Sequence, residues 1–585
     1  MWRRHGVADL QSTAAAARRF DRESRAYTFC MATASADAPA GRDLIDRLLT
    51  PAAYPHPVGP IRLIETHISW VFLTGEYVYK LKKPVDLGFL DFTSLEKRRH
   101  YCAEEVRLNR RFAPRLYLDV VPISGPSSAA RVDGGGEPVE WAVRLRQFDD
   151  TDRLDRLLER GGLSATACGQ LAVEIARLQE GLEVADEGTP WGTAEAVAAA
   201  IDTTLDRLRR HRPDLGDRVA GLARRLHAML SARAAAFAAR REGGRVRQCH
   251  GDLHLANLVR IDGRFVAFDA IEFSDTLRWI DVASDVAFLA MDLAARGRPD
   301  LAATFTSGWI EAADDHHATT VLPVYACYRA AVRAAVAAIR SAQAVAGLPI
   351  DPAAARSAAA EADRYLTLAE TLAADRRPVL VATSGVSGSG KTTLAGGLAA
   401  RLGAVRLRSD VERKRLAGMA ATDRPGDAAA TAALYSEATS RRTYERLARL
   451  AGLMLAAGTP VVVDAACNRR GERRLLAEAA RAASVPLVWL SLDVPADVAV
   501  ARVATRLASG ADASDASAEV VRGQLLSRDP ILPDELAPSG GGGARESLVR
   551  VAGADVADPA AVARLAARIE GCVVRQPAGS GGSSW

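Results

Sequence analysis

Residues 248–273 carry side chains whose types and spacing suit phosphoryl transfer. The stretch reads QCHGDLHLANLVRIDGRFVAFDAIEF, with His250 and Asp252 on a loop, Asn257 five residues after Asp252, and Asp269 beyond a second apolar run. A carboxylate can orient or deprotonate an attacking hydroxyl, while an amide oxygen and a second carboxylate can hold Mg²⁺ against phosphate oxygens. This arrangement predicts transfer of a phosphoryl group from ATP.

A predicted β-hairpin separates the two candidate metal ligands. The apolar runs 258–261 and 265–268 flank Asp262-Gly263, a dipeptide that favours a tight turn. Such a hairpin would hold Asn257 and Asp269 side by side. The order of loop, strand, turn and strand is therefore expected to bring both ligands to one metal.

A second phosphate-binding motif occupies residues 385–392. It fits the pattern G-x-x-x-x-G-K-[ST] completely, and it lies between the apolar strand 379–383 and a helix through Leu402. Glycines let backbone N–H groups turn toward phosphates, and the helix N-terminus favours negative charge. The predicted nucleotide-binding residues here are Gly385, Gly388, Ser389, Gly390, Lys391, Thr392 and Thr393.

Three residues of this second site have predicted roles in handling the nucleotide and its metal. Lys391 would contact the β and γ phosphates, and Thr392 would offer its hydroxyl to Mg²⁺. Asp464 ends the apolar strand 460–464 and would hold the same ion from the far side.

Asp410 follows the predicted strand 404–408, at the carboxyl edge of the sheet, where open α/β folds bind ligands. It would bind or deprotonate an acceptor hydroxyl, or it caps the helix 411–416. Arg502 and Arg506 precede Ser514-Asp515-Ala516, and they would belong to a closing lid that stabilises the transferring charge. An ordinary solvated arginine pair is the alternative.

Strands alternate with helices after residue 378, which predicts an α/β domain over residues 378–575 with a mainly parallel sheet covered on both faces. Its predicted strands are 379–383, 404–408, 460–464, 486–492 and 547–551.

The first half predicts an α+β domain over residues 46–372. Its expected strands are 61–64, 68–73, 77–81, 118–123 and 140–147, with a helix over 94–112. Leu, Ala and Arg at helical spacing then predict a large helical part over 152–240, 277–293 and 312–373. Asp281 and Asp285, on one helix face, would cap a helix or steady the catalytic loop.

The order of strands, helix and strands resembles the small lobe of a protein-kinase-like, bilobal fold, where a strand lysine pairs with a helix glutamate on the nucleotide phosphates. The resemblance implies Lys80 and Glu105 in these roles. Lys82 lies on the same side of the strand and is the alternative. Lys80, Lys82 and Lys83 are also what an edge strand would carry to discourage aggregation.

Two families resemble the two halves. Through H-G-D-L-H-L-A-N and D-A-I-E-F, roughly residues 55–370 resemble the aminoglycoside phosphotransferase-like kinases, which implies Asp252 as catalytic base, Asn257 and Asp269 as Mg²⁺ ligands and Lys80 on the phosphates. The G-x-G-x-x-G loop of protein kinases is missing, so another turn, around residues 74–76, is expected to cover the nucleotide.

Residues 378–575 resemble the P-loop small-molecule kinases of the gluconate kinase, shikimate kinase and zeta-toxin type. The matching features are the motif 385–392, Ser409-Asp410, Asp464 and the two lid arginines. The whole chain is similar to bacterial fusions of a phosphotransferase-like domain with an AAA-type predicted kinase.

Composition predicts a cytoplasmic enzyme. Charged residues make up 25% and the net charge is +5, so no nucleic-acid or membrane partner is expected. Seven separated cysteines without a C-x-x-C pair favour a reducing compartment. The apolar stretch 321–348 contains three arginines and predicts a buried helix. Residues 1–45 are expected to be a disordered extension, or the product of an upstream start before Met31, and residues 576–585 a disordered tail.

The sequence therefore predicts an ATP- and Mg²⁺-dependent phosphotransferase with two nucleotide sites, acting on hydroxyl groups of small molecules. One alternative makes the P-loop half a regulatory nucleotide switch, and another makes one half an inactive binding module, although both sets of site residues are intact. An antibiotic-modifying version would use acidic residues such as Asp275, Asp292 and Glu311 against a cationic acceptor. Acceptor identity and oligomeric state stay open.

Overall fold

The computed structural model describes residues 39–66, 68–86, 90–345, 352–374, 377–509, 518–536, 546–553 and 555–574. These residues form two compact units. Unit 1 takes the chain up to residue 164 together with 174–295 and 321–373, and unit 2 takes 165–173, 296–320 and the chain from 374 onward. The predicted tail and most of the predicted N-terminal extension lie outside the described residues.

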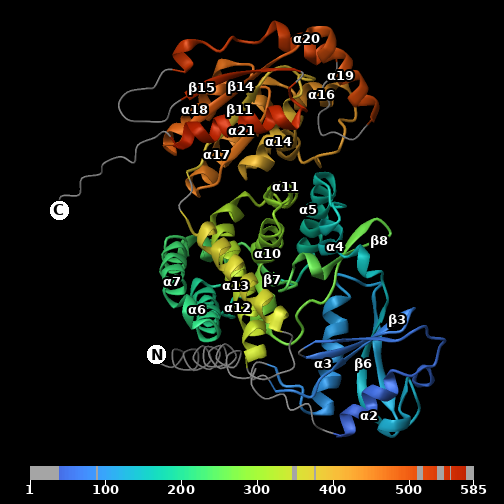
Figure 1. The fold of residues 1–585 in the computed structure, drawn as a ribbon. Helices are drawn as coiled ribbons and strands as arrows, with labels where there is room; N and C mark the ends of the chain where they lie inside the picture. Colours follow the sequence, from blue (N-terminus) through green and yellow to red (C-terminus); the bar gives the residue numbers. More distant parts are fainter. Residues whose placement is uncertain are drawn as a thin grey trace, which may run out of the picture. The chain divides into compact units, whose positions relative to one another are not determined.

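Unit 1 begins with a six-stranded antiparallel sheet in the order β1-β2-β3-β6-β4-β5. The strands are β1 (Arg62–Glu65), β2 (Ser69–Leu73), β3 (Tyr77–Lys82), β4 (Tyr117–Ser124), β5 (Arg131–Val132) and β6 (Pro138–Arg146). Helix α3 (Leu95–Asn109) lies beside this sheet in Figure 1, with Cys102 and Val106 packed against Val143 and Leu145. The Oγ of Ser94 accepts the Lys97 N–H and caps the helix.

The five strands and the helix predicted for this lobe are present, with ends that differ by a few residues. Two elements were not predicted. β5 is only two residues long, and α2 (Pro39–Leu48) begins inside the segment expected to be a disordered extension up to residue 45. α2 is ordered because Leu44 and Leu48 pack into the core of the sheet with Phe72.

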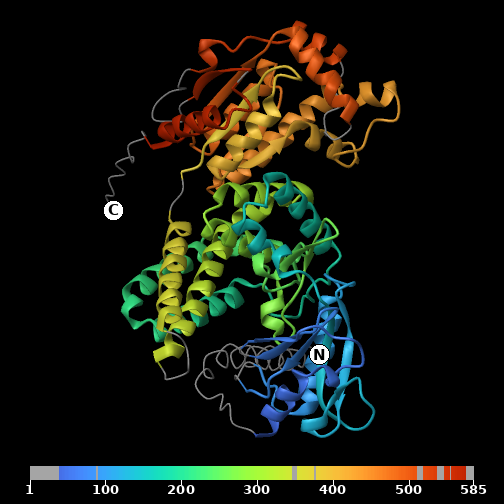
Figure 2. The same cartoon turned by 45° about the vertical axis from the view of Figure 1, so that its right-hand side comes forward.

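The rest of unit 1 is mostly helical, as predicted. Its elements are α4 (Leu154–Glu159), the end of α5 (Ala165–Glu180), α6 (Ala194–His211), α7 (Gly216–Ser231), α8 (Ala234–Glu242), β7 (Val246–Gln248), η5 (Leu255–Asn257), β8 (Leu258–Ile261), β9 (Arg264–Ala267), α9 (Asp275–Arg278), β10 (Trp279–Asp281), α10 (Val282–Ala295), α12 (Leu322–Val345) and α13 (Pro352–Leu372). Figure 2 shows the green and yellow helices of this part gathered together, separate from the blue sheet.

α12 is central to this helical part and contacts α6, α10 and α13. Within the part of the chain that the structure describes, it is the one helix long and apolar enough to cross a membrane by length and composition. However, 72% of its most apolar stretch is buried inside the structure. Packing against the neighbouring helices therefore accounts for its composition, in agreement with the predicted buried helix.

Unit 2 contains a five-stranded sheet in the order β12-β13-β11-β14-β15, in which every pair is parallel. The strands are β11 (Leu380–Ser384), β12 (Val405–Arg408), β13 (Val461–Asp464), β14 (Leu487–Asp493) and β15 (Glu546–Ala552). The helices are α11 (Pro299–Ala313), α14 (Lys391–Leu402), α15 (Ser409–Leu416), α16 (Ala428–Leu434), α17 (Glu437–Ala456), α18 (Arg470–Ala482), α19 (Ala496–Ser509), α20 (Ala518–Leu526) and α21 (Pro559–Val574).

Both faces of this sheet are buried, as predicted for a parallel sheet. Val381 and Val462 pack with Leu394 of α14 and Ile569 of α21 in one core cluster. Side chains alternate along a strand, so neighbours such as Val463 point to the opposite face, and these are fully buried too. The predicted strands agree with the observed ones to within a residue or two.

Candidate functional site

The catalytic-loop candidate 250–252 needs glycine in its middle. Gly251 has φ +84°, and a Cβ on it would lie 2.6 Å from the Leu277 carbonyl oxygen. Nδ1 of His250 accepts the Asp252 N–H at 3.3 Å, so Nε2 carries the proton and donates to the Phe268 carbonyl at 2.9 Å. Burial lowers the pKa of His250, which keeps this bridge neutral.

Two helices hold the same loop from behind. The Asp285 carboxylate accepts the N–H groups of His250 and Gly251 at 2.9 and 3.1 Å. Nη1 of Arg329, on α12, donates to the Gly251 carbonyl at 3.0 Å. Asp281 instead pairs with the buried Arg240, at 2.6 Å. Of Asp281 and Asp285, Asp285 is therefore the residue that steadies the loop.

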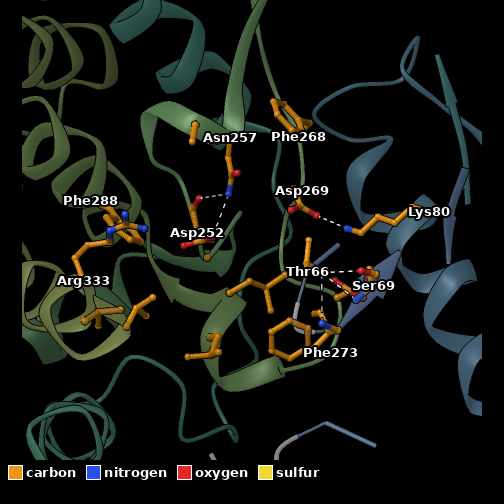
Figure 3. Close-up of a pocket in the computed structure, with 18 of the residues that line it drawn as sticks. Thr66, Ser69, Lys80, Asp252, Asn257, Phe268, Asp269, Phe273, Phe288 and Arg333 are labelled. Atoms are coloured by element: carbon orange, nitrogen blue, oxygen red, sulfur yellow. Dashed lines mark hydrogen bonds and ion pairs between the residues drawn. The ribbon is translucent and has the colours of Figure 1, made fainter. Parts of the chain in front are cut away.

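Asp252 and Asn257 are linked at the centre of the site (Figure 3). Nδ2 of Asn257 donates to the backbone and side-chain oxygens of Asp252, both at 3.0 Å, so the amide oxygen is the Asn257 atom that could act as a metal ligand. Burial opposes ionisation of Asp252, but His254, His250 and Arg333 together hold the pKa of its carboxyl well below the usual range. Asp252 is therefore a carboxylate at neutral pH.

Asp269 lies at the end of the predicted hairpin, whose turn at Asp262-Gly263 has positive φ at both residues, as a tight hairpin turn requires. Asp269 itself has φ +63°, a conformation that aspartate tolerates better than most residues. Its N–H donates to the Tyr117 hydroxyl at 3.0 Å. Asn109 exchanges two hydrogen bonds with Ala270, at 2.7 and 3.3 Å.

Lys80 connects Asp269 to α3. Its Nζ lies 2.6 Å from Asp269 and 2.9 Å from Glu105. Lys82 reaches the other Glu105 oxygen at 2.5 Å and also contacts Glu272. Lys82 is fully buried, whereas Lys80 lines the cavity, so Lys80 is the lysine placed to meet a ligand.

The edge-strand explanation for these lysines is wrong. β3 lies inside the sheet, because it pairs with β2 on one side and with β6, further along the chain, on the other. Burial would lower the pKa of Lys80, but the Asp269 and Glu105 carboxylates hold it well above its usual value, so the lysine stays charged.

These groups border a cavity of about 1520 Å³ that runs from β2 and β3 to α6 and α12. Val71, Val78, Leu145 and Phe268 give its sheet end an apolar lining. Gly75, in the turn expected to cover the nucleotide, also lines it, and the Gln147 side chain accepts the Gly75 N–H at 3.0 Å.

Asn109, Tyr117 and Glu272 support this site and were not predicted. Asn109 and Tyr117 act on a segment more than 150 residues further along the chain, so no local pattern marks them. Glu272 lies in the D-A-I-E-F segment, where a charged residue between two apolar ones could have marked it as a candidate.

The P-loop of unit 2 has the conformation that its glycines predict. Gly388 has φ +82°, and a Cβ there would lie 2.3 Å from the Ala499 carbonyl oxygen. Nζ of Lys391 donates to the Val386 carbonyl at 2.7 Å. The Ser389 hydroxyl is buried and has no hydrogen-bond partner among the described residues. A backbone cradle with a lysine, a helix N-terminus and a spare buried hydroxyl fits a nucleotide phosphate chain.

Thr392 and Asp464 lie together beneath this loop. The Thr392 hydroxyl is 3.4 Å from an Asp464 carboxylate oxygen at the end of β13. Burial raises the pKa of Asp464, and Arg406, Arg408 and Lys391 act against that rise. A hydroxyl beside a carboxylate at the carboxyl end of a strand is a donor set that fits Mg²⁺.

Asp410 is not the helix cap that was considered for it. The cap position of α15 is Arg408, and Asp410 lies in the first turn without a capping role. It lines a cavity of about 1110 Å³ together with Lys391, Thr392, Thr393 and Asp464.

Arg502, on α19, lines the same cavity, with Nη1 3.5 Å from the Gly388 carbonyl oxygen. The side chain of Arg506 and residues 514–516 lie outside the described residues, so the predicted lid stays a prediction. The sequence gave no signal for Gln524, whose side-chain oxygen accepts the Ser387 N–H at 2.7 Å.

Two known families match separate parts of the chain. Residues 90–322 match the phosphotransferase enzyme family, and residues 380–531 match an AAA domain. A gluconokinase from Sinorhizobium meliloti 1021 is 22% identical, with a TM-score of 0.22 over 33% of this chain and 97% of its own. A choline/ethanolamine kinase family protein from Mesorhizobium loti is 13% identical, with a TM-score of 0.31 over 56% of this chain and 99% of its own.

Mycobacterial relatives match both parts of the chain. The uncharacterized protein Rv2004c of Mycobacterium tuberculosis (strain ATCC 25618 / H37Rv) is 33% identical over 475 residues, which cover 80% of this chain and 90% of the relative. The uncharacterized protein Mb2027c of Mycobacterium bovis matches with the same identity and coverage. The chain therefore belongs to the family of these proteins, and it joins a kinase-like domain of the phosphotransferase enzyme family to a P-loop kinase domain of the AAA type.

Proposed function

We propose that the chain is an ATP- and Mg²⁺-dependent phosphotransferase with two nucleotide sites, one in each unit, and that each transfers the γ-phosphate to a hydroxyl group of a small molecule. The observation that carries this proposal is the convergence of Lys80, from β3, with Asp252, Asn257 and Asp269, from the stretch 248–273, on one cavity of unit 1. The residue types match the needs of phosphoryl transfer, a process that depends mainly on positioning and charge stabilisation.

In unit 1, Asp252 would orient the acceptor hydroxyl for in-line attack on the γ-phosphorus. Its depressed pKa makes it a weak base, which suits a proton that leaves the hydroxyl late in the transfer. Lys80 would bind the nucleotide phosphates, and Glu105 would hold that lysine in place. Asn257 and Asp269 would hold Mg²⁺, an ion that supplies positive charge against the phosphate oxygens.

In unit 2, the backbone of residues 385–390 would cradle the phosphates, with Lys391 as a point charge and Thr392 and Asp464 as the metal ligands. Asp410 would meet the acceptor hydroxyl, since it lines the same cavity without serving as a helix cap. A purely regulatory nucleotide switch needs no acceptor-binding carboxylate at this place.

The test is a search for two separate products. The protein is incubated with γ-labelled ATP and a fractionated small-molecule extract, and the assay is repeated with Asp252→Asn and with Lys391→Ala. Each change is expected to remove a different labelled product. The matched controls are Asp262→Asn, in the exposed hairpin turn, and Lys97→Ala, on the exposed face of α3, and both should keep all products. If neither site change alters any product, the proposal of two phosphotransferase sites is wrong.

A further inference from the structure

The end of the unit 1 cavity that lies away from the sheet is basic. Helices α6 and α12 form walls there, and each lines the cavity with one face. The polar lining residues on these two faces are Thr203, Thr204, Arg207 and His211 of α6, and Tyr325, Tyr328, Arg329, Arg333 and Arg340 of α12. The hydroxyls and cations of these walls are hydrogen-bond donors suited to an acceptor rich in oxygen atoms.

Carboxylates are missing from both walls. Among the described residues that line the cavity, the acidic ones are Asp149, Asp150, Asp252, Asp269, Glu272 and Asp281, and none of them comes from α6 or α12. Two of them, Asp269 and Glu272, pair with Lys80 and Lys82. Among the described residues, the two walls therefore offer no carboxylate to pair with a cationic acceptor.

The three acidic residues that the sequence offers for a cationic acceptor have other partners. Asp275 pairs with Arg278, Asp292 accepts the Leu255 N–H at 3.1 Å, and Glu311, in unit 2, lies 3.4 Å from Arg408. None of the three lines this cavity.

Two arginines of α12 contact the same carboxylate. Arg333 and Arg340 share one carboxylate, that of Glu361 on α13, at 3.5 and 2.6 Å. The Nε atoms of both arginines are buried and have no hydrogen-bond partner among the described residues. Glu361 is therefore the carboxylate in contact with both guanidinium groups, while the charges of Asp292 and Asp252 also act on Arg333.

Arg333 also connects this wall to the reaction centre. In the view of Figure 3, Arg333 and Phe288 lie on one side of Asp252, and Asp269 and Lys80 lie on the other. The positive charge of Arg333 contributes to the low pKa of Asp252, and the negative charge of Asp252 contributes to the raised pKa of Arg333. A hydroxyl held at Asp252 would therefore have the nucleotide on one side and the arginines on the other.

We propose that the acceptor of unit 1 carries an anionic group, a carboxylate or a phosphate monoester, that binds to the arginines of α6 and α12 while its hydroxyl meets Asp252. In the transfer, the hydroxyl oxygen forms a bond to the γ-phosphorus, the bond from that phosphorus to the β–γ bridging oxygen breaks, ADP leaves, and the hydroxyl proton passes to Asp252 and then to solvent. This inference rests on the phosphotransferase function proposed for unit 1.

The experiment separates a cell extract by ion exchange into acidic, neutral and basic pools of small molecules. Each pool is incubated with γ-labelled ATP and the Lys391→Ala protein, which leaves unit 1 as the working site. The product of unit 1 is the one that is lost when the protein carries Asp252→Asn together with Lys391→Ala. This product should form from the acidic pool. Phosphatase treatment of that pool beforehand separates the two anions, because it removes a phosphate monoester acceptor and spares a carboxylate.

Two other results are possible, and each has its own meaning. A product that depends on Asp252 but forms from the neutral or basic pool would overturn the anionic acceptor and leave the phosphotransferase function standing. If no pool gives a product that depends on Asp252, the function proposed for unit 1 is wrong, and so is the inference of an anionic acceptor.

The arginines are tested on the acidic pool's product. Arg333→Gln and Arg340→Gln should each raise the KM for the acceptor about 10-fold to 100-fold, the range of one charge-assisted hydrogen bond, with the KM for ATP nearly unchanged. Arg340→Lys, which keeps the charge, should recover part of the loss, and Arg224→Gln, on the exposed face of α7, should have no effect. An unchanged acceptor KM in both glutamine variants would overturn the assignment.

Discussion

The two phosphate sites are built in opposite ways. In unit 1, side chains from distant segments meet, since Lys80 pairs with Glu105 across 25 residues and with Asp269 across 189. In unit 2, one short loop provides the cradle from its own backbone, and Asp464, Asp410 and Arg502 join it from other elements. Removal of a single charge should therefore lower the stability of unit 1. Distortion of the loop backbone should instead weaken nucleotide binding by unit 2.

The largest expected effect is on the stability of unit 1. Glu105→Gln leaves Lys80 and Lys82 without the carboxylate that both contact, in a fully buried position. Removing one partner of a buried ion pair costs about 3–5 kcal/mol, so the free energy of unfolding of unit 1 should fall by that amount. Hydrogen exchange of β3 and α3 amides under increasing denaturant measures it.

The neighbouring residue provides the control for this change. Glu104 pairs with Arg107 at the surface, and Glu104→Gln should cost less than about 1 kcal/mol. Equal effects of the two changes would mean that the buried network contributes nothing special to unit 1.

A smaller effect is expected from Gly388→Ala in unit 2. The added Cβ would meet the Ala499 carbonyl oxygen at 2.3 Å, in a backbone conformation that alanine rarely adopts. Such strain costs about 1–3 kcal/mol, and the change should weaken ATP binding by unit 2 about 10-fold or more. Binding of a labelled ATP analogue to the Lys80→Ala protein, in which unit 2 is the remaining nucleotide site, provides the measurement.

Gly452→Ala serves as the matched control, because nothing lies within 4 Å of a Cβ at that position. If Gly388→Ala binds ATP as tightly as the unchanged loop, the backbone cradle is not what holds the phosphates.

Asp410→Asn separates acceptor chemistry from nucleotide binding. Asp410 lines the unit 2 cavity and caps no helix, so kcat for the unit 2 product should fall about 10-fold to 100-fold while the KM for ATP stays nearly constant. Asp427→Asn is the control, since Asp427 caps α16 by accepting the Ala430 N–H and asparagine caps equally well. Normal turnover in the Asp410 variant would exclude it from the reaction.

The smallest effect is the pH dependence of unit 1. Burial holds the pKa of His250 below its unfolded value of about 6.5, so the unfolded chain takes up a proton that the folded loop resists. Stability is present above pH 6.5 and is lost as pH falls, by at most about 1.4 kcal/mol per pH unit. His250→Gln should flatten this slope in denaturant titrations from pH 7.5 to 5.

His227→Gln tests whether that slope belongs to the buried ring. His227 is exposed and lies 2.7 Å from Asp202, so its removal should leave the loss of stability at low pH in place. A slope that survives His250→Gln unchanged would show that other groups cause it.

The same contrast explains what could be predicted from sequence. The P-loop and the hairpin are encoded locally, through glycines and an Asp-Gly turn, and both have the predicted form. The lysines on β3 were open to an edge-strand explanation because strand order is a long-range property, and sequence order does not show that β6 pairs with β3. Tyr117 and Asn109 escaped prediction for the same reason.

Counting bound nucleotides shows whether the chain has two separate nucleotide sites. Equilibrium dialysis with a labelled, non-hydrolysable ATP analogue and Mg²⁺ should give two equivalents per chain for the unchanged protein. Lys391→Ala and Lys80→Ala should each lower the count to one, and the two changes together should abolish binding. A single equivalent in the unchanged protein, or one that survives both changes, would contradict the account of two separate phosphate sites.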